Sequence, residues 1–360
     1  MKKIGIVTIV GDNNYGNKLQ NYAVEKFLKK ITDYQVETIR NIAPLNNEKR
    51  NFTDYLKAIK WILKYRVLEK FTKRYQYFNN FNKYINYNKY YFTFSRRKQE
   101  KFYYDYLIIG SDQVWNPNYR FKDFDLGMFG NKNSKKISFA ASMSVEKWPS
   151  NIDKKKLLNS LENFTGISVR EEKAKELLQE LGLKKNVEVL IDPTMLLTAK
   201  EWDEVSEKPK QLNCSKYILN YFLGELSESR KKEIDRIAQE NDCEVINILD
   251  KKSPFYNTGP SEFLYLEKNA FLICTDSFHS SVFAILYNRP FIIFDRERKN
   301  VTNMNSRFDT LLSKFKIKNR KFNGKITKEN LNHDYTEAYK ILETERQKSM
   351  NFLQELFKIK

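Results

Sequence analysis

The chain has 360 residues, enough for two domains of ordinary size. Hydrophobic residues make up 41% of it and aromatic residues 14%, which excludes a disordered chain although 30% of the residues are charged. The 3 Cys are widely spaced and there are only 2 His, which argues against a disulfide framework and against a metal site. The net charge of +19 leaves open a nucleic-acid partner, an anionic membrane surface or no specific partner.

The first half of the chain alternates strand and helix patterns. Buried strands are predicted at residues 4–10, 36–39, 106–109, 137–141, 166–169 and 187–191. Leu19, Ala23, Phe27 and Ile31 recur every four residues, which predicts a helix after the first strand, and another is predicted at 171–181. This βαβ order predicts a parallel sheet with a ligand site at the carboxyl ends of its strands.

The second half repeats this order after the break at Asp192-Pro193 and a polar stretch, 198–212, that we interpret as a linker. Strands are predicted at 217–222, 244–249, 271–274 and 291–294, and helices at 227–240, 260–268, 277–287 and 335–360. We expect an α/β fold with two Rossmann-like domains, 1–197 and 198–334, facing each other across a cleft. The last helix, 335–360, is expected to pack back on the first domain.

A basic, aromatic insert occupies about residues 50–103 of the first domain. Residues 54–101 hold 13 Lys and Arg against 3 Asp and Glu, a net charge of +10. Apolar and basic residues interleave there at helical spacing, so a helical insert is predicted. One interpretation is a peripheral contact with anionic lipid, and the other is packing of its aromatic residues on the first domain. No recognition module accompanies the charge, so nucleic acid is not an expected partner.

No signal peptide is evident in the sequence. The apolar run at residues 4–10 has no cleavage-type end and is too short to span a bilayer. The expected location is therefore the cytoplasm, with a contact to the inner face of the cell membrane as a hypothesis.

The sharpest chemical signal follows the strand predicted at 271–274. His279 falls in the first turn of the next helix, where backbone N–H groups bind anions, phosphate in particular. Thr275 or Asp276 can cap that helix, and Ser277, Ser280 and Thr275 add hydroxyl donors. An ionisable His beside a phosphate site suits group transfer from a phosphorylated donor, although a first-turn His can also simply cap or pack.

Three further motifs follow predicted strands. Amide side chains that suit sugar hydroxyls surround a glycine turn in the group Asn14, Tyr15, Gly16, Asn17 and Gln20. The group Gly110, Ser111, Asp112 and Trp115 offers a carboxylate for a hydroxyl and an indole to stack on a sugar ring. Arg170 can grip a carboxylate or phosphate. Each motif also has a structural interpretation: a βα turn, a capped turn with a packed Trp, and a surface charge.

Together these motifs resemble the polysaccharide pyruvyl transferase family. The similarity runs in order along nearly the whole chain, in NYGNKLQNYA (14–23), YLIIGSDQVWNP (106–117), SVRE (168–171), IDPTMLL (191–197), TGPSEFL (258–264), TDSFHSSVFAILYNRPF (275–291) and MNSRFDTLL (304–312).

The resemblance implies a GT-B-like, two-domain fold and transfer of pyruvate from phosphoenolpyruvate to a hexose of a capsular polysaccharide or exopolysaccharide. The acceptor would be a sugar or a lipid-linked oligosaccharide, and no cofactor or metal would be needed. His279 is the implied catalytic residue. Ser277 stands where many members have Arg, so a cation for the donor is expected from Arg170, Arg307 or Arg296, in that order.

Two other functions stay open. One is a glycosyltransferase of the same two-domain plan that uses a nucleotide sugar, and the other is a non-catalytic polysaccharide assembly protein. The first would need a clamp for a diphosphate and a pocket for the base, neither of which the sequence identifies. The second is compatible with Ser277 in place of Arg.

Overall fold

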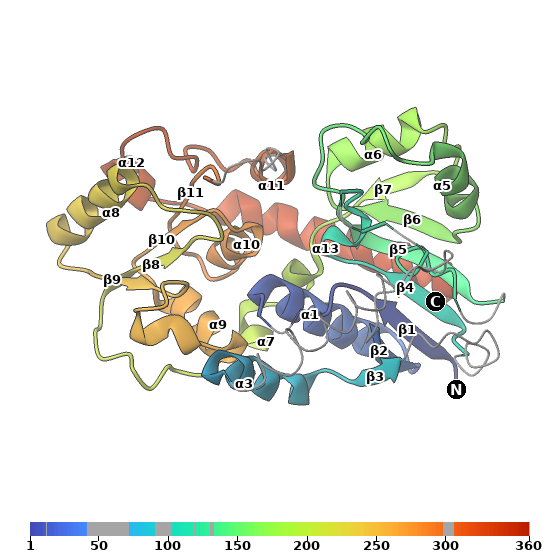
Figure 1. Ribbon diagram of the computed structural model, residues 1–360, viewed down its shortest axis with the longest axis horizontal. Helices are drawn as coiled ribbons and strands as arrows, with labels where there is room; N and C mark the ends of the chain where they lie inside the picture. Colours follow the sequence, from blue (N-terminus) through green and yellow to red (C-terminus); the bar gives the residue numbers. More distant parts are fainter. Residues whose placement is uncertain are drawn as a thin grey trace, which may run out of the picture. The chain divides into compact units, whose positions relative to one another are not determined.

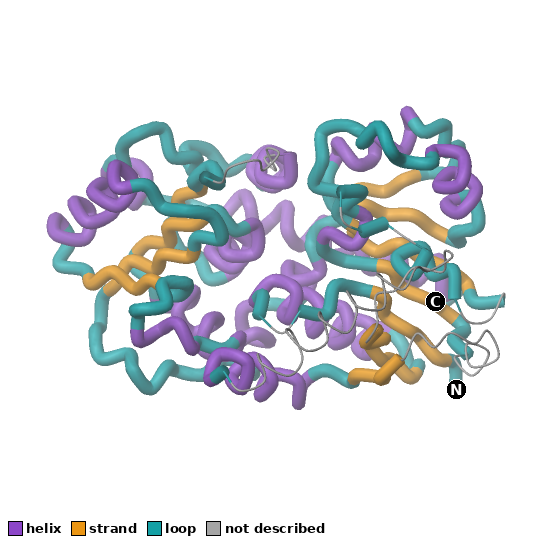
Figure 2. The backbone as a smooth tube through the Cα atoms, in the orientation of Figure 1, coloured by secondary structure: helices purple, strands orange, loops and turns teal. Residues whose placement is uncertain are grey.

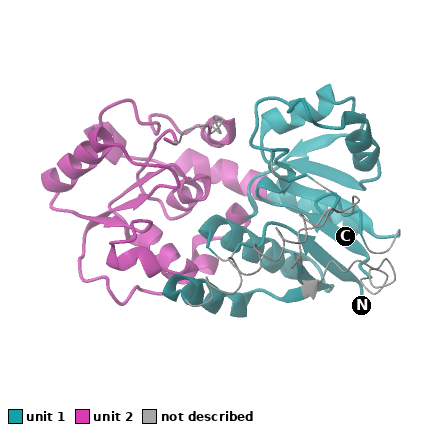
Figure 3. Ribbon diagram, viewed as in Figure 1, with its two compact units in different colours: residues 1–193, 347–360 teal, residues 194–346 magenta. Residues whose placement is uncertain are grey.

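The structure is a computed structural model, and it describes residues 1–11, 13–41, 72–90, 103–118, 120–121, 123–129, 133–297 and 306–359. The chain forms two compact units (Figure 3): unit 1 is Met1–Pro193 with Gln347–Lys360, and unit 2 is Thr194–Arg346. The sequence placed the division at 197/198, four residues further along. The final residues, 347–360, belong to unit 1.

Unit 1 contains a seven-stranded sheet of order β3-β2-β1-β4-β5-β6-β7 (Figures 1 and 2). Every strand pair is parallel. The strands are β1 (Lys3–Val7), β2 (Gln35–Asn41), β3 (Tyr87–Tyr90), β4 (Tyr106–Ile109), β5 (Lys135–Ala141), β6 (Gly166–Val169) and β7 (Val187–Val189). The predicted parallel sheet is confirmed, and the first strand ends at Val7, three residues before its predicted end. The strand order reverses between β1 and β4, the position at which doubly wound sheets bind ligands.

Helices cover both faces of this sheet. Leu107 and Ile109 belong to the hydrophobic cluster that holds Leu157 and Leu161 of α5 (Lys154–Leu161) and Leu177 and Leu178 of α6 (Glu172–Glu180). Tyr106, one residue earlier in β4, contacts Phe357 of α13 (Thr336–Phe357). Phe27 of α1 (Tyr15–Ile31) stacks on Phe139 of β5. Because successive side chains of a strand point to opposite faces, these contacts lie on opposite sides of the sheet.

The described part of the insert, 72–90, contains helix as predicted and also a strand that the sequence did not predict; most of the residues with helical spacing lie outside the described residues. It forms α3 (Lys73–Asn80), the 3₁₀ helix η3 (Phe81–Tyr84) and then β3, which extends the sheet beside β2. Tyr and Asn alternate near β3, and Tyr favours strands. Phe81 packs edge-on against Tyr22 of α1. For these residues the packing interpretation holds, whereas residues 54–71 and 91–101, which carry the lipid hypothesis, lie outside the described residues.

Unit 2 contains a four-stranded parallel sheet of order β11-β10-β8-β9. Its strands are β8 (Tyr217–Tyr221), β9 (Glu244–Asn247), β10 (Leu272–Thr275) and β11 (Phe291–Ile293). The helices between them are α8 (Glu228–Glu240), α9 (Pro260–Asn269) and α10 (Phe278–Leu286), followed by α11 (Ser306–Lys314) and α12 (Lys328–Leu331). Here the order reverses between β8 and β10, so the second half also forms a Rossmann-like unit.

The predicted linker at 198–212 is wrong. It begins with α7 (Ala199–Asp203), whose N-cap Thr198 and third residue Glu201 form a capping box. Trp202 is fully buried, and its indole N–H donates to the Thr194 carbonyl at 3.0 Å. The Thr-x-x-Glu spacing is a readable helix start, but the polar composition of the stretch obscured it.

The end of α13 is part of the core of unit 1. The Phe357 ring is 1% exposed and lies 4.8 Å from the Tyr106 ring and 6.0 Å from the Tyr34 ring, measured between centroids. Leu356 also fills the space beside Gly166, where an added Cβ would lie 2.3 Å from its Cδ1. The last turn of the helix therefore fixes the sheet that carries the loops of unit 1.

Phe357→Ala is expected to destabilise unit 1 by about 3–5 kcal/mol, because it removes a buried ring and leaves a cavity. Native-state hydrogen exchange of the β4 amides measures the loss for this unit separately. Lys358→Ala, at the exposed neighbour, is the control and should change stability by less than about 0.5 kcal/mol. A loss below about 1 kcal/mol for Phe357→Ala would contradict the packing.

Candidate functional site

Two predicted motifs of unit 1 meet at the point where the strand order reverses. Gly110 has φ +134°, and an added Cβ would lie 2.1 Å from the Phe139 carbonyl oxygen, so only glycine fits there. The next residue is held by α1, because the Ser111 N–H donates to Gln20 Oε1 at 3.1 Å. Gln20 Nε2 in turn donates to Thr8 Oγ1 at 2.8 Å. The loops after β1 and β4 are thus tied together by amide and hydroxyl groups.

The asparagines Asn14 and Asn17 also take part in the contact between α1 and the loop after β4. The Asn14 side chain caps α1 by accepting from the Asn17 N–H at 3.1 Å. The Asn17 side chain donates to the Asp112 carboxylate, which follows β4. Gly16 lies inside α1 and is buried, so it does not form the glycine turn that the sequence predicted. The structure thus brings Asn17 and Asp112 into contact with each other, and so joins two motifs that the sequence analysis treated separately.

Arg170 lies at the centre of this edge of the sheet and is only 3% exposed. Its guanidinium is 2.5 Å from Asp192, 3.6 Å from Glu171 and 3.9 Å from Asp112. Burial alone would lower the pKa of Arg170, but the three carboxylates, Asp192 foremost, outweigh that effect and raise it. The side chain therefore stays charged, and its charge is committed to the carboxylates of the protein.

Two acidic residues of this network were not singled out from the sequence. Glu171 accepts hydrogen bonds from the Ser142 hydroxyl and from the Met143 N–H, and thereby ties the end of β5 to the start of α6. Asp192 follows β7 and is 2% exposed. Both stand directly after predicted strands, which was the signal available for them. Three carboxylates thus lie around one guanidinium at this edge.

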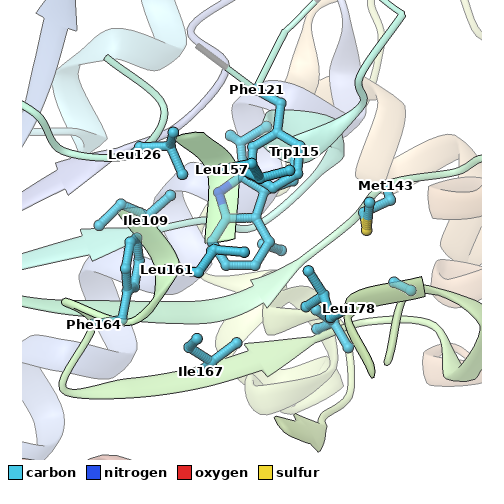
Figure 4. Close-up of a cluster of buried hydrophobic side chains, with 14 of the residues drawn as sticks. Ile109, Trp115, Phe121, Leu126, Met143, Leu157, Leu161, Phe164, Ile167 and Leu178 are labelled. Atoms are coloured by element: carbon cyan, nitrogen blue, oxygen red, sulfur yellow. The ribbon is translucent and has the colours of Figure 1, made fainter. Parts of the chain in front are cut away.

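The structure corrects two predicted ligand contacts. Tyr15 is fully buried, its ring lies 4.8 Å from Phe78 and its hydroxyl accepts from Arg74 at 3.1 Å. Trp115 is also fully buried, and its indole N–H donates to the Asp125 carbonyl at 3.1 Å. Figure 4 shows the indole packed among the core side chains, stacked on Phe121. Large aromatic rings contribute most when buried, so both residues build the core and offer no free face to a sugar.

In unit 2 the predicted turn from strand to helix is present. The Thr275 hydroxyl donates to the Tyr221 carbonyl at 2.7 Å and accepts from the Ser277 N–H at 3.0 Å. Ser277 is the N-cap of α10, but its side chain makes no capping bond. His279 is the second residue of α10 and 6% exposed. The helix therefore begins with its positive pole uncapped by the Ser277 side chain and with an imidazole in the first turn.

Two of the arginines of unit 2, Arg296 and Arg307, lie near this turn. Arg296 donates from Nε to the Asp276 carboxylate at 3.1 Å and from a terminal nitrogen to the Asp276 carbonyl at 3.0 Å. Arg307 of α11 is 5% exposed, and its guanidinium lies 5.8 Å from the centre of the Phe278 ring, next to His279 in the chain. Of the three cations expected for the donor, these two belong to the unit that carries His279, and Arg170 belongs to the other.

A buried carboxyl group lies against the first turn of α10. Glu267 of α9 is fully buried and accepts from the Ser280 hydroxyl at 2.5 Å. Burial raises the pKa of Glu267 well above its usual value, and the Ser280 hydrogen bond offsets only part of that rise. Ser280, predicted to contact the substrate, instead anchors the helix start to α9.

The comparisons with known proteins agree with this arrangement. The family model described as polysaccharide pyruvyl transferase matches residues 14–298, from the cap of α1 to the loop after β11. The chain belongs to the polysaccharide pyruvyl transferase family. It is therefore a transferase, and membership places its general role in the pyruvylation of polysaccharides.

Solved structures resemble the fold of this family member. The UDP-GlcNAc 2-epimerase from Neisseria meningitidis bound to UDP-GlcNAc is 10% identical with a TM-score of 0.53, and the match covers 99% of both chains. MurG from Acinetobacter baumannii is 9% identical with a TM-score of 0.45, over 99% of both chains. At this identity the likeness concerns the fold alone, which is GT-B-like. A search of curated proteins finds no significant sequence match.

Two general features complete the description of the family member. Among the described residues, none of the helices combines the length and apolar character needed to cross a bilayer. Within the same ranges, no cluster of three or more His, Cys, Asp or Glu side chains is arranged to hold a metal ion.

Arg170→Met is expected to destabilise unit 1 by about 3–5 kcal/mol, because it leaves three buried carboxylates without their cation. Urea unfolding monitored by hydrogen exchange in β6 measures the loss. Lys173→Met removes an exposed pair with Glu176 in the neighbouring helix and should cost less than about 1 kcal/mol. If Arg170→Met costs no more than this control, the guanidinium does not hold the network together.

Glu267→Gln tests the buried carboxyl group. The pKa of Glu267 is higher in the folded than in the unfolded chain, so its stabilisation is complete below about pH 4.3 and declines as pH rises toward the folded pKa. The variant lacks this titration, so its stability relative to the natural protein should rise by up to about 1.4 kcal/mol per pH unit within that window. Unfolding free energies at pH 5 and pH 8 measure it, with exposed Glu240→Gln as control. A difference independent of pH would contradict the burial.

Proposed function

We propose that this chain transfers pyruvate from phosphoenolpyruvate to two hydroxyls of a hexose, as a ketal, in a capsular or exopolysaccharide repeat unit. The observation that carries the proposal is the first turn of α10, where His279 follows the N-cap residue Ser277 and the Arg307 guanidinium lies 5.8 Å from the centre of the Phe278 ring. With a lipid-linked acceptor, the reaction would take place in the cytoplasm at the inner face of the cell membrane.

Unit 2 suits the anionic donor. The first N–H groups of a helix point toward its N-terminus and favour phosphate or carboxylate. Arg307 adds a positive charge beside Phe278, whereas the charge of Arg296 is paired with the Asp276 carboxylate. Where many family members have Arg, this chain has Ser277, so we assign the donor cation to Arg307, from α11. This replaces Arg170, whose charge is neutralised inside unit 1.

Unit 1 suits the acceptor sugar. Carboxylates accept hydrogen bonds from sugar hydroxyls, and amide side chains both donate and accept. The edge formed by Asn17, Asp112, Glu171 and Asp192 is lined by carboxyl groups, which disfavour an anionic donor such as phosphoenolpyruvate there. In this assignment the donor binds to unit 2 and the neutral sugar to unit 1.

The chemistry requires one proton carrier near the donor. Protonation of the methylene carbon of phosphoenolpyruvate makes the neighbouring carbon electrophilic, and a sugar hydroxyl adds there and loses its proton. A second hydroxyl then displaces phosphate, which takes up that hydroxyl's proton, and the cyclic ketal closes. We assign the proton transfer to His279, because it is the ionisable ring in the first turn of α10.

The test incubates the purified chain with phosphoenolpyruvate and a panel of soluble and lipid-linked glucosides, galactosides and mannosamine derivatives. Phosphate release together with a mass gain of one pyruvate ketal on the acceptor is the expected result. His279→Asn should slow the reaction by about 100- to 10,000-fold. His333→Asn is the matched control and should keep full activity, since the His333 ring contacts the Asn288 carbonyl at 3.0 Å, just beyond the C-terminal end of α10 and not at the first turn that holds His279.

Two results would overturn the proposal. The first is transfer of a sugar from a nucleotide sugar to the same acceptors without phosphate release from phosphoenolpyruvate. The second is full turnover of phosphoenolpyruvate by His279→Asn. The chain would then still be a pyruvyl transferase, but the assignment of proton transfer to His279 would be wrong.

A further inference from the structure

The carboxyl ends of β8 and β10 mark the position in unit 2 where a doubly wound sheet binds its ligand. The strand order reverses between these two neighbouring strands, so the connections leave on opposite sides and open a crevice at their ends. In nucleotide-binding sheets this crevice takes a diphosphate. What occupies it here therefore decides which anions unit 2 can hold.

A side chain of the protein occupies the crevice. One carboxylate oxygen of Asp276, which follows β10, accepts from the Leu223 N–H at 2.7 Å. The other accepts from the Gly224 N–H at 2.7 Å and from Arg296 Nε at 3.1 Å. Two main-chain donors and a guanidinium that converge on one carboxylate make an anion site, and Asp276, 2% exposed, fills it from within.

The surroundings leave little room for a different arrangement. A Cβ on Gly224 would lie 2.7 Å from Arg296 Cγ, 2.9 Å from the Glu297 carbonyl oxygen and 3.0 Å from Asp276 Oδ2. The Glu225 N–H donates to the Glu297 carbonyl at 2.9 Å, so the loop after β8 is also fixed to the segment after β11. The loops after β8, β10 and β11 thus close around the one carboxylate.

We propose that Asp276 is a built-in anion that excludes a nucleotide diphosphate from the crevice of unit 2 and positions the first turn of α10. Asp276 directly precedes Ser277, the N-cap, and lies three residues before His279. Its carboxylate holds the turn to the loop after β8, and the Thr275 hydroxyl holds it to the Tyr221 carbonyl at 2.7 Å. Asp276 is therefore a positioning residue and does not contact the donor, unlike the prediction from the sequence.

The inference has one part that rests on the proposed function and one that does not. The effect on turnover requires that phosphoenolpyruvate is the donor. The occupancy of the anion site and the exclusion of a diphosphate are properties of unit 2 alone. Binding measurements therefore test them even if the chain shows no pyruvyl transfer.

The first experiment titrates the full chain with UDP, inorganic pyrophosphate and phosphoenolpyruvate by calorimetry. We expect no saturable binding of UDP or pyrophosphate. Binding of either with an affinity equal to or tighter than that of phosphoenolpyruvate would overturn the exclusion. If phosphoenolpyruvate also fails to bind, the proposed function fails, but the exclusion of the diphosphate stands.

The second experiment vacates the anion site and refills it. Asp276→Ser removes the carboxylate, so formate should raise the melting temperature of this variant and leave the natural protein unchanged. With phosphoenolpyruvate and acceptor, the variant should lose on the order of 100-fold in kcat through misplacement of the turn, with a smaller change in KM, and formate should restore part of kcat. Equal effects of formate on both proteins would overturn the occupancy.

Two variants complete the design. Gly224→Ala forces the same loops apart but keeps the carboxylate, so it should lower kcat without any response to formate. Asp250→Ser, at an exposed residue of unit 2 whose carboxylate accepts only from the Lys252 N–H at 2.9 Å among the bonds described, should change neither kcat nor the formate response. Rescue of Gly224→Ala by formate would contradict the assignment to Asp276.

Discussion

The buried guanidinium of Arg170 is the interaction on which the carboxyl edge of unit 1 depends. A charge that is 3% exposed costs several kcal/mol unless other groups neutralise it. Here the neutralising groups come from separate loops: Asp112 after β4, Glu171 at the start of α6 and Asp192 after β7. Because the sheet is parallel, all these loops leave the same edge, and a single cation can join them.

Unit 2 also buries a charged group at the carboxyl ends of its strands, but there the buried group is an anion. There the buried ion is the Asp276 carboxylate, and the loops that surround it supply main-chain N–H groups and Arg296. The outcome for the two edges differs. In unit 1 three carboxyl groups surround one guanidinium, whereas in unit 2 Arg307 lies beside Phe278 at the start of α10, where the Ser277 side chain makes no capping bond. This difference is the physical basis for assigning the sugar to unit 1 and the anion to unit 2.

The sequence predicted both sheets because buried parallel strands read as short apolar runs, such as 106–109 and 271–274. Its predictions were wrong about elements and side chains whose placement depends on contacts between residues far apart in the chain. The insert was read by its helical spacing alone, whereas β3 exists because β2 offers an open edge. Tyr15 and Trp115 were assigned to a ligand by their position after strands, but that position also faces the core, where Phe78 and Phe121 lie.

The site residues show which features of the site a sequence pattern does not predict. A motif indicates which side chains follow which strand: Asp112, Arg170 and Asp276 do stand just after strands, and Asn17 lies in the first turn of the helix after β1. It does not indicate whether each faces a ligand or another motif. Polar groups buried at one edge must first satisfy each other, and Asn17 with Asp112, or Ser280 with Glu267, do so.

The proposed function assigns the donor cation to Arg307 because Ser277 stands where the resemblance implies an arginine. An arginine at the N-cap would bring its charge to the pole of α10 from within the motif itself. In this chain Arg307 reaches the neighbouring Phe278 ring from α11, a separate element. The short Ser277 side chain leaves the first N–H groups of α10 without a side-chain cap. A cation on a separate helix can contact an anion bound at the first turn of α10 only if that turn keeps its position relative to α11. The hydrogen bonds of Asp276 and Thr275 hold the turn in position, so they matter to the site as much as the Arg307 charge does.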